Sequence, residues 1–310
     1  MRIGTRRSAL ALAQANLIAG LLGNCEIVPV LTSGDRRQDA GAGTDAGAGT
    51  DASDKSRWVT ELEDALQAGE IDLAVHSAKD VPGELAHGLA LLGAPPRAAA
   101  EDVLCGAGEL DRLRPQARVG TSSIRRLAQL QAAREDLQVV ALRGNVDTRL
   151  RKLAEPAEGL DAIVLARAGL QRLGRESEAG AVLDAERFIP APGQGVIALE
   201  GREEDVRTRE AVQAITDQDA LACLLAERSL ARELGASCHT PLGAHAAPAG
   251  CGCLLLRAWV GLPDGSAWVR DELLGGFYDA EALGRRVAER LLAAGAGEML
   301  RRAEEMAATP

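Results

Sequence analysis

The sequence lacks any long apolar segment. No run approaches the ~18 consecutive apolar residues that a membrane-spanning helix needs, so we expect no membrane partner. The N-terminus, Met1-Arg2-Ile3-Gly4, leads into a predicted strand without the apolar region of a signal peptide. These absences predict a cytoplasmic protein.

Cysteine is sparse, with six residues in a chain of 310. This spread is too thin for a disulfide framework, and a cytoplasmic chain would keep its thiols reduced. Cys251 and Cys253, with His245, lack the fourth ligand and the paired Cys-x-x-Cys pattern of structural zinc, so we expect no metal site. Cys238 lies in a loop marked by glycine and proline and is the candidate exposed thiol.

Positive charge is also in deficit, since the formal net charge is −10. A net negative chain does not bind nucleic acid nonspecifically and has no overall attraction for an anionic substrate. If the ligand is acidic, local arginine clusters must attract it. The apolar fraction of 46% is ample for buried cores, and the length allows two or three domains.

Lysine occurs only three times, at positions 55, 79 and 152. Lys79 and Asp80 directly follow a predicted buried strand over residues 71–75, and the carboxyl ends of strands in open α/β sheets are where ligands collect. A carboxylate beside a cation can serve as a general acid or base. The alternative is a helix cap followed by a loop that ends at proline, which we would favour for an isolated pair.

Further basic and hydroxyl residues follow other predicted strands. Free amides and the positive end of a helix dipole make such turns suitable for a carboxylate or phosphate. Each turn alone is equally consistent with an ordinary cap or an exposed charged helix face, but repetition at equivalent positions favours an anion site. The residues are Arg6 and Ser8; Thr121, Ser123, Arg125 and Arg126; Arg143 and Arg149; and Arg172.

The order of predicted elements indicates an α/β fold with doubly wound lobes. Proline-containing segments near Pro95 and Pro192 mark two crossings between lobes, so the first lobe is discontinuous. We predict a first lobe of residues 1–94 and 193–215 and a second of 95–192. Residues 216–310 are predicted to form a small C-terminal α+β domain, with strands over residues 254–262 and 266–270.

A low-complexity segment repeats Ala-Gly-Ala-Gly-Thr-Asp over residues 40–51. Two copies of six residues cannot form a stacked repeat core, so the segment is predicted to be a flexible loop within a lid of about residues 36–57. Lys55 and Trp58 follow the repeat, and a helix is predicted from about 59 to 68.

Together these motifs are highly specific, although no single one would be. In chain order they are Thr5-Arg6-x-Ser8, Val75-His76-Ser77-x-Lys79-Asp80-Val81-Pro82, Val119-Gly120-Thr121-Ser122-Ser123-x-Arg125-Arg126, Leu142-Arg143-Gly144-Asn145, Gly193-Gln194-Gly195 and Cys238-x-x-Pro241-Leu242-Gly243. The chain closely resembles the porphobilinogen deaminase family, also called hydroxymethylbilane synthases, over essentially its whole length.

The resemblance implies two lobes like those of a periplasmic binding protein and a third domain whose cysteine, here Cys238, carries a dipyrromethane cofactor through a thioether. It implies that four porphobilinogen units are added head to tail with loss of ammonia. It also implies that the enzyme acts as a monomer in tetrapyrrole (haem) synthesis. By the same resemblance Asp80 and Lys79 are catalytic and Lys55 and Trp58 belong to the lid. The implied binding residues are Arg6, Ser8, Ser77, Lys79, Thr121, Ser123, Arg125, Arg126, Arg143, Arg149 and Arg172.

The sequence departs from the family pattern at three places. Asp54-Lys55-Ser56-Arg57-Trp58 stands where a Gly-Lys-Gly-Leu-Phe-like lid is common, and Ser237 and His239 flank the cysteine differently from many relatives. Asp147 occupies a position that is more often small or neutral, and its negative charge between Arg143 and Arg149 predicts weaker local binding of carboxylates. The competing hypothesis is a noncatalytic two-lobed binding protein for small anions. Cys238 and the Lys79-Asp80 pair argue against it, because a pure binder needs neither.

Overall fold

The computed structural model describes residues 1–30, 52–237 and 239–308. They fall into two compact units. The first contains Met1–Arg97 and Val196–Leu221, and the second contains Ala98–Gly195 and Ala222–Pro310. The first unit is therefore built from two separate stretches of chain.

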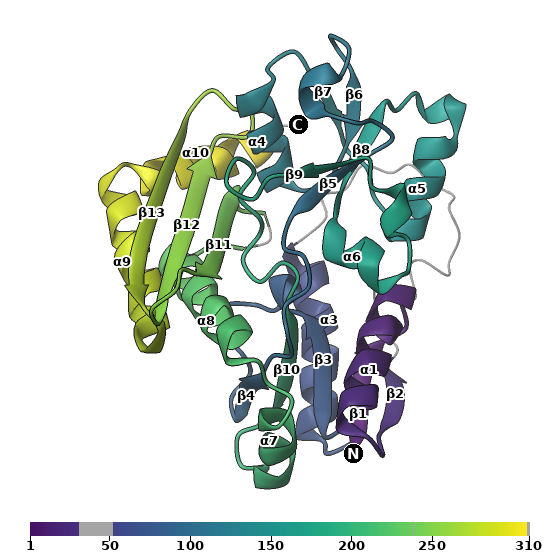
Figure 1. Cartoon of the computed structure of the whole chain (residues 1–310), viewed down its shortest axis with the longest axis vertical. Coiled ribbons are helices and arrows are strands. Elements are labelled where there is room, and N and C mark those ends of the chain that lie inside the picture. The colour runs from purple at the N-terminus through teal and green to yellow at the C-terminus, as the bar shows by residue number, and fades with distance from the viewer. Residues whose placement is uncertain (31–51, 238, 309–310) are drawn as a thin grey trace. The chain divides into compact units, whose positions relative to one another are not determined.

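The first unit is a five-stranded sheet in the order β2-β1-β3-β10-β4. Strand β1 runs parallel to β2 and β3, whereas β10 runs antiparallel to β3 and β4. Strand β10 follows the excursion through the second unit in sequence but lies between two strands of the first (Figure 1). The strands are β1 (Arg2–Arg6), β2 (Glu26–Val30), β3 (Leu73–Ser77), β4 (Leu89–Gly93) and β10 (Ile197–Arg202); the helices are α1 (Ala9–Leu22), α3 (Ala52–Gln67) and α7 (Val206–Gln213).

Helix α1 shows why these elements form. Ser8 caps its first turn, because its side chain accepts a hydrogen bond from the amide of Ala11. Ala11, Ala15 and Ile18 then recur on one face and are buried against the sheet. At Gly4 in β1, a Cβ atom would lie 2.2 Å from the Cδ1 atom of Ile71, so a side chain would not fit there.

The second unit begins with a sheet of equivalent design, in the order β7-β6-β8-β5-β9. Strand β6 runs parallel to β7 and β8, and β5 runs antiparallel to β8 and β9. The strands are β5 (Asp102–Cys105), β6 (Arg118–Gly120), β7 (Gln138–Val140), β8 (Ala162–Ala166) and β9 (Ala181–Leu183); the helices are α4 (Ile124–Ala133), α5 (Val146–Ala154) and α6 (Arg167–Arg172).

A small α+β domain completes the second unit. Its antiparallel sheet, β11-β12-β13, shares a core with α8, α9 and α10. On β12, Trp259 packs with Ala128 of α4 and with Ile189, so this sheet contacts the preceding lobe. The elements are α8 (Gln218–Glu233), β11 (Leu242–Pro248), β12 (Cys253–Gly261), β13 (Trp268–Gly276), α9 (Ala280–Ala293) and α10 (Ala296–Ala308) (Figure 1).

The predicted fold class is confirmed: two sheet-containing α/β lobes and a small C-terminal α+β domain. Two details were wrong. Helix α3 begins at Ala52 and not near residue 59, so residues 52–57 of the predicted lid are helical, and the predicted strand 266–270 extends from Trp268 to Gly276. The repeat over residues 40–51 lies outside the described residues, and the predicted domain boundaries stay predictions.

Candidate active site

The turn after β3 carries the Lys79-Asp80 pair. Residues Ala78–Asp80 form a single 3₁₀ turn, and the amide of Ala78 donates to the carbonyl oxygen of Val196 at 3.0 Å. The side-chain amide of Gln14 donates to the hydroxyl of Ser77 at 2.9 Å. The turn is thus tied to Val196 through its backbone, and the preceding residue, Ser77, is tied to α1 through its side chain.

Asp80 itself is half-buried and, among the described residues, forms no hydrogen bond or ion pair. Lys79 beside it is exposed. A carboxylate on a fixed backbone with no internal partner can exchange a proton with a bound molecule.

The turn between β1 and α1 carries Arg6 and Ser8. Arg6 is the last residue of β1 and is half-buried. Ser8 uses its hydroxyl oxygen to cap α1, and the neighbouring hydroxyl of Thr5 donates to the carbonyl of Ala11 at 3.2 Å. This capping hydrogen bond therefore holds the side chain of Ser8 at the start of α1.

In the second unit, the turn between β6 and α4 is built from hydroxyl residues. The Thr121 hydroxyl oxygen accepts from the amide of Ser123 at 3.2 Å, and Ser123 caps α4 by accepting from the amide of Arg126 at 3.4 Å. Ser122 donates its hydroxyl hydrogen to the carbonyl of Leu142. The hydroxyls stabilise the start of the helix that delivers Arg125 and Arg126.

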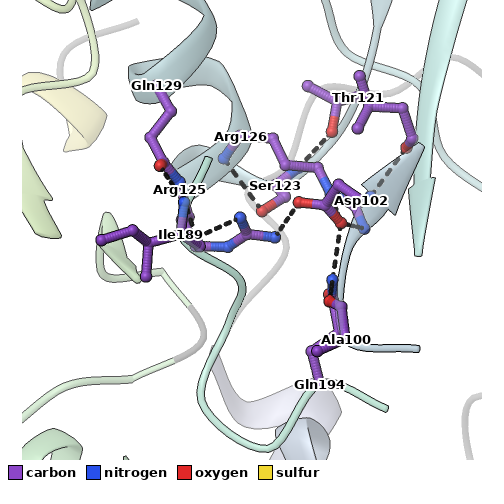
Figure 2. A network of polar contacts seen from close by, with 10 residues as sticks. Ala100, Asp102, Thr121, Ser123, Arg125, Arg126, Gln129, Ile189 and Gln194 are labelled. Atoms are coloured by element: carbon purple, nitrogen blue, oxygen red, sulfur yellow. Dashed lines mark hydrogen bonds and ion pairs between the residues drawn. The ribbon is translucent and has the colours of Figure 1, made fainter. Parts of the chain in front are cut away.

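Arg125 and Arg126 share one carboxylate, that of Asp102 at the start of β5 (Figure 2). Arg125 Nη2 lies 2.8 Å from Asp102 Oδ2, and Arg126 Nη2 lies 2.7 Å from Oδ1. All three side chains are buried. The guanidiniums also donate to backbone carbonyls, Arg125 to that of Ile189 and Arg126 to that of Val164.

This arrangement fixes the charge of the cluster. Burial alone would raise the pKa of Asp102, but Arg125 and Arg126 lower it well below its usual range. Burial lowers the pKa of Arg125, and Asp102 opposes that effect. The cluster therefore contains two guanidinium cations and one carboxylate anion near neutral pH.

The turn between β7 and α5 carries Arg143 and Arg149. Gly144 has φ +120°, and a Cβ atom there would lie 2.8 Å from Thr148 Cγ2, so the turn requires glycine. Its carbonyl accepts from Arg149 Nε at 2.8 Å. Arg143 is exposed and pairs with no described residue.

Asp147, the unusual acid of this helix, is paired with a cation outside the predicted binding set. Its Oδ1 atom lies 2.6 Å from Nη1 of Arg175. The negative charge of Asp147, which lies between Arg143 and Arg149 in sequence, is therefore paired with the guanidinium of Arg175.

Arg172 ends α6 and is held by the segment that leads back to the first unit. Its Nη2 atom donates to the carbonyl of Gly195 at 2.6 Å, and burial lowers its pKa to about 10. No described carboxylate pairs with it. A partly buried cation of this kind favours an anionic partner.

The predicted site residues thus form two sets, one in each unit, and they lie at the last residue of a strand, in the turn that follows it or on the helix that follows that turn. Cys238 and the side chains of Lys55 and Trp58 lie outside the described residues. The prediction missed Asp102 and Gln194, although Gln194 lies in the quoted Gly-Gln-Gly motif and Asp102 begins an apolar strand. The first unit holds Arg6, Ser8, Ser77, Lys79 and Asp80; the second holds Thr121, Ser123, Arg125, Arg126, Arg143, Arg149 and Arg172.

The described ranges contain neither a membrane-spanning helix nor a cluster of metal-binding side chains. No helix there is both long and apolar enough to cross a membrane. No group of three or more histidine, cysteine, aspartate or glutamate side chains in those ranges could hold a metal ion.

Two α/β lobes whose strand-end turns present guanidiniums, hydroxyls and a carboxylate are suited to small anionic ligands. Comparison with known proteins identifies the family. The family model described as "Porphobilinogen deaminase, dipyromethane cofactor binding domain" matches residues 1–210, and that of the porphobilinogen deaminase C-terminal domain matches 221–293. The chain belongs to the porphobilinogen deaminase family.

Relatives with this description match nearly the whole chain. The porphobilinogen deaminase of Syntrophus aciditrophicus is 40% identical and covers 98% of this chain and 99% of its own length. That of Deinococcus deserti is 42% identical and covers 98% of each chain. The family makes this chain an enzyme, a transferase of porphyrin synthesis with a dipyrromethane cofactor.

Two solved structures show weak likeness. One is described as an ABC transporter from Parabacteroides distasonis, with a TM-score of 0.40 and 15% identity; it covers 74% of this chain and 73% of its own. A TRAP periplasmic solute binding protein from Ralstonia eutropha has a TM-score of 0.36 and 12% identity, and covers 75% of this chain and 79% of its own.

Proposed function

We propose that this chain performs its family's reaction with Asp80 as the proton-transfer group and Cys238 as the cofactor anchor. The reaction joins four porphobilinogen molecules head to tail with loss of one ammonia from each, and hydrolysis by one water molecule then frees linear hydroxymethylbilane and leaves the dipyrromethane behind. The observation that carries the assignment of Asp80 is its carboxylate, which sits on a fixed turn and forms no bond with any described residue.

Recognition of the substrate follows from its charge. Porphobilinogen carries an acetate and a propionate, so each added ring brings two carboxylates. Each charge-assisted hydrogen bond to such a group contributes about 1.5–3 kcal/mol. The guanidiniums best suited to bind these carboxylates are those of Arg143, which is exposed and pairs with no described residue, and of Arg172, which is half-buried and pairs with no described carboxylate.

The second unit also fits a dipyrromethane. Arg125 Nε is buried without a hydrogen-bond partner among the described residues, and the Arg125–Arg126 cluster has one positive charge in excess. Ligand carboxylates would satisfy both. Thr121, Ser123 and the amide end of α4 would add neutral donors. When bound, the dipyrromethane supplies the pyrrole carbon to which the first substrate ring is joined.

Asp80 would have three roles, one after another. Its carboxyl group donates a proton to the leaving amine, and the resulting carboxylate then stabilises the positive charge that deamination leaves on the substrate ring. After ring coupling the carboxylate accepts the pyrrole proton. Lys79, exposed next to it, would bind a substrate carboxylate.

The proposal names porphobilinogen as the small-molecule partner and requires neither nucleic acid nor a membrane. It takes the working form to be a cytoplasmic monomer. Light scattering on the purified chain measures that state directly, and a stable dimer would contradict it.

The mass of the denatured chain tests the anchor. A thioether survives denaturation, so the wild-type chain should be heavier than its sequence by two linked pyrrole units, and an acidic aldehyde reagent for pyrroles should colour it without added substrate. Cys238→Ser should abolish the increment and the activity. Serine replacements of Cys251, which is exposed, and of Cys253 are matched controls and should keep the increment.

If the increment persists in Cys238→Ser, or disappears in a control, the anchor is misassigned. A wild-type chain that binds porphobilinogen but releases no ammonia would instead support a noncatalytic anion-binding protein.

A further inference from the structure

Asp102 contacts every member of the buried arginine cluster. Its Oδ1 atom accepts from Nε and Nη2 of Arg126 at 3.1 and 2.7 Å, and from Nε2 of Gln194 at 2.9 Å. Its Oδ2 atom accepts from Nη2 of Arg125 at 2.8 Å. Figure 2 shows this carboxylate between the side chains that it joins.

We propose that Asp102 is a positioning residue for ligand binding: it holds the guanidiniums of Arg125 and Arg126 side by side and limits their combined charge to one excess positive charge. The inference rests on the proposed function, in which these arginines bind cofactor or substrate carboxylates. It assigns to Asp102 no contact with the ligand.

The guanidinium cations of Arg125 and Arg126 repel each other. Arg125 and Arg126 are adjacent in sequence and point to the same buried place, and Arg126 lowers the pKa of Arg125. Without an anion between them, two buried like charges would separate or draw in water. With Asp102 in place the sum is one positive charge, which a single ligand carboxylate neutralises.

The guanidiniums of Arg125 and Arg126 are both held in a set orientation. Each is held at one end by Asp102 and at another by a backbone carbonyl, that of Ile189 for Arg125 and that of Val164 for Arg126. Two fixed points define the plane of a guanidinium, so its remaining N–H groups have set directions. Directed donors cost a ligand less ordering entropy than mobile ones.

Gln194 ties Asp102 to the backbone. Its Nε2 atom also donates to the carbonyl of Ala100 at 2.7 Å, two residues before Asp102. Gln129 in α4 holds the neighbouring support, because its side chain both accepts from and donates to the backbone of Ile189, at 2.7 and 3.0 Å. The cluster therefore has a rigid frame in which Asp102 is the shared anion.

Two substitutions separate charge from position. Asp102→Asn keeps the shape of the side chain, but it removes the negative charge and directs an amide NH2 group toward one guanidinium. Asp102→Glu keeps the charge and moves the carboxylate by one methylene. Asp161→Asn is the matched control, since Asp161 accepts from both Arg114 and the amide of Arg118 in the same lobe without contacting the cluster.

The experiment uses full-length chains made in cells that cannot synthesise porphobilinogen. Each chain is incubated with porphobilinogen. Thermal unfolding and the fraction of chains that gain the dipyrromethane mass are then measured, followed by the KM and kcat of the loaded protein. Asp102→Glu should unfold close to the wild type, load slowly and show a KM raised about tenfold or more, with a smaller change in kcat. Asp102→Asn should lose both stability and loading.

The control should lose some stability and keep wild-type loading and KM. The proposal is overturned if either Asp102 variant folds and matches the wild type in loading and KM, or if Asp161→Asn loses loading equally. If neither Asp102 variant folds, Asp102 serves stability alone and the proposal fails as well. A wild-type chain that never gains the mass would overturn the proposed function itself, whatever the variants do.

Discussion

Asp80 of the first lobe and Asp102 of the second are both aspartates at the sheet edge of a five-stranded α/β unit, yet their surroundings are opposite. Asp80 forms no bond with the described residues, whereas two guanidiniums and an amide hold Asp102. The arginines lower the pKa of Asp102 so far that it cannot accept a proton near neutral pH. In the proposed mechanism, the carboxylate that exchanges protons has no hydrogen-bond partner among the described residues, and the carboxylate that positions cations is hydrogen-bonded to three side chains.

The same contrast separates the arginines. Arg125 and Arg126 are buried and bonded to the protein, whereas Arg143 is exposed and unpaired among the described residues. If both kinds bind ligand as proposed, a buried arginine contributes to folding and to binding, whereas an exposed one contributes to binding alone. Substitutions can therefore distinguish the two environments by which property changes.

The largest expected effect is on turnover, from Asp80→Asn. The amide cannot donate or accept the required proton, so we expect the rate to fall by about 10²–10⁴. Because Asp80 forms no hydrogen bond or ion pair with the described residues, thermal unfolding and the cofactor mass should stay near those of the wild type. Near wild-type ammonia release by the purified, loaded variant would remove Asp80 from the mechanism.

The next effect compares Arg126→Gln with Arg143→Gln. Loss of Arg126 leaves the buried Asp102 carboxylate without one of its two cations, so the free energy of unfolding should fall by about 3 kcal/mol or more. Arg143→Gln should change it by less than about 0.5 kcal/mol while raising KM. Denaturant unfolding and steady-state kinetics measure both quantities. Equal stability losses would mean that burial does not separate these arginines.

The sequence predicted the parts of this contrast that depend on local pattern. Ser8 was recognised as a cap, and the basic turns after β6 and β7 were located, because strand, turn and helix follow one another within a few residues. Short elements were missed. Strand β9 has only three residues. Strand β11 is rich in small side chains, so its sequence shows little alternation between polar and apolar residues, and it is recognised as a strand only by its pairing with β12.

Burial of the arginines was not predictable in this way. Asp102 precedes Arg125 by 23 residues and Gln194 follows it by far more, so their convergence exists only once β5 lies beside β8 and the connection after Ile189 returns to the sheet. Asp147 gives the same lesson. Its position in sequence, between Arg143 and Arg149, predicts interference with binding, but its carboxylate pairs with Arg175 of a later segment.

The smallest expected effect adds a third carboxylate to the comparison, that of Glu63 in α3. It is buried, and its Oε1 atom accepts from the amide of Ala86 at 2.9 Å. Burial, together with nearby Glu200, raises the pKa of Glu63, while the Ala86 amide opposes the shift. Unlike Asp102, Glu63 is therefore a carboxylate whose ionised form the fold disfavours.

A carboxyl group with a raised pKa in the folded state contributes stability below its unfolded pKa, about 4.3, and loses that contribution as the pH rises through the folded value. Glu63→Gln keeps an oxygen for the Ala86 amide and removes the ionisation. The variant should be more stable than the wild type at pH 7.5 by about 1 kcal/mol or less, a shift of about 2–4 °C in Tm, and should lose this advantage near pH 4. Glu70→Gln, an exposed neighbour, should show neither effect. A Glu63→Gln chain that melts below the wild type at pH 7.5 would mean that the Glu63 carboxylate stabilises the fold, as Asp102 does.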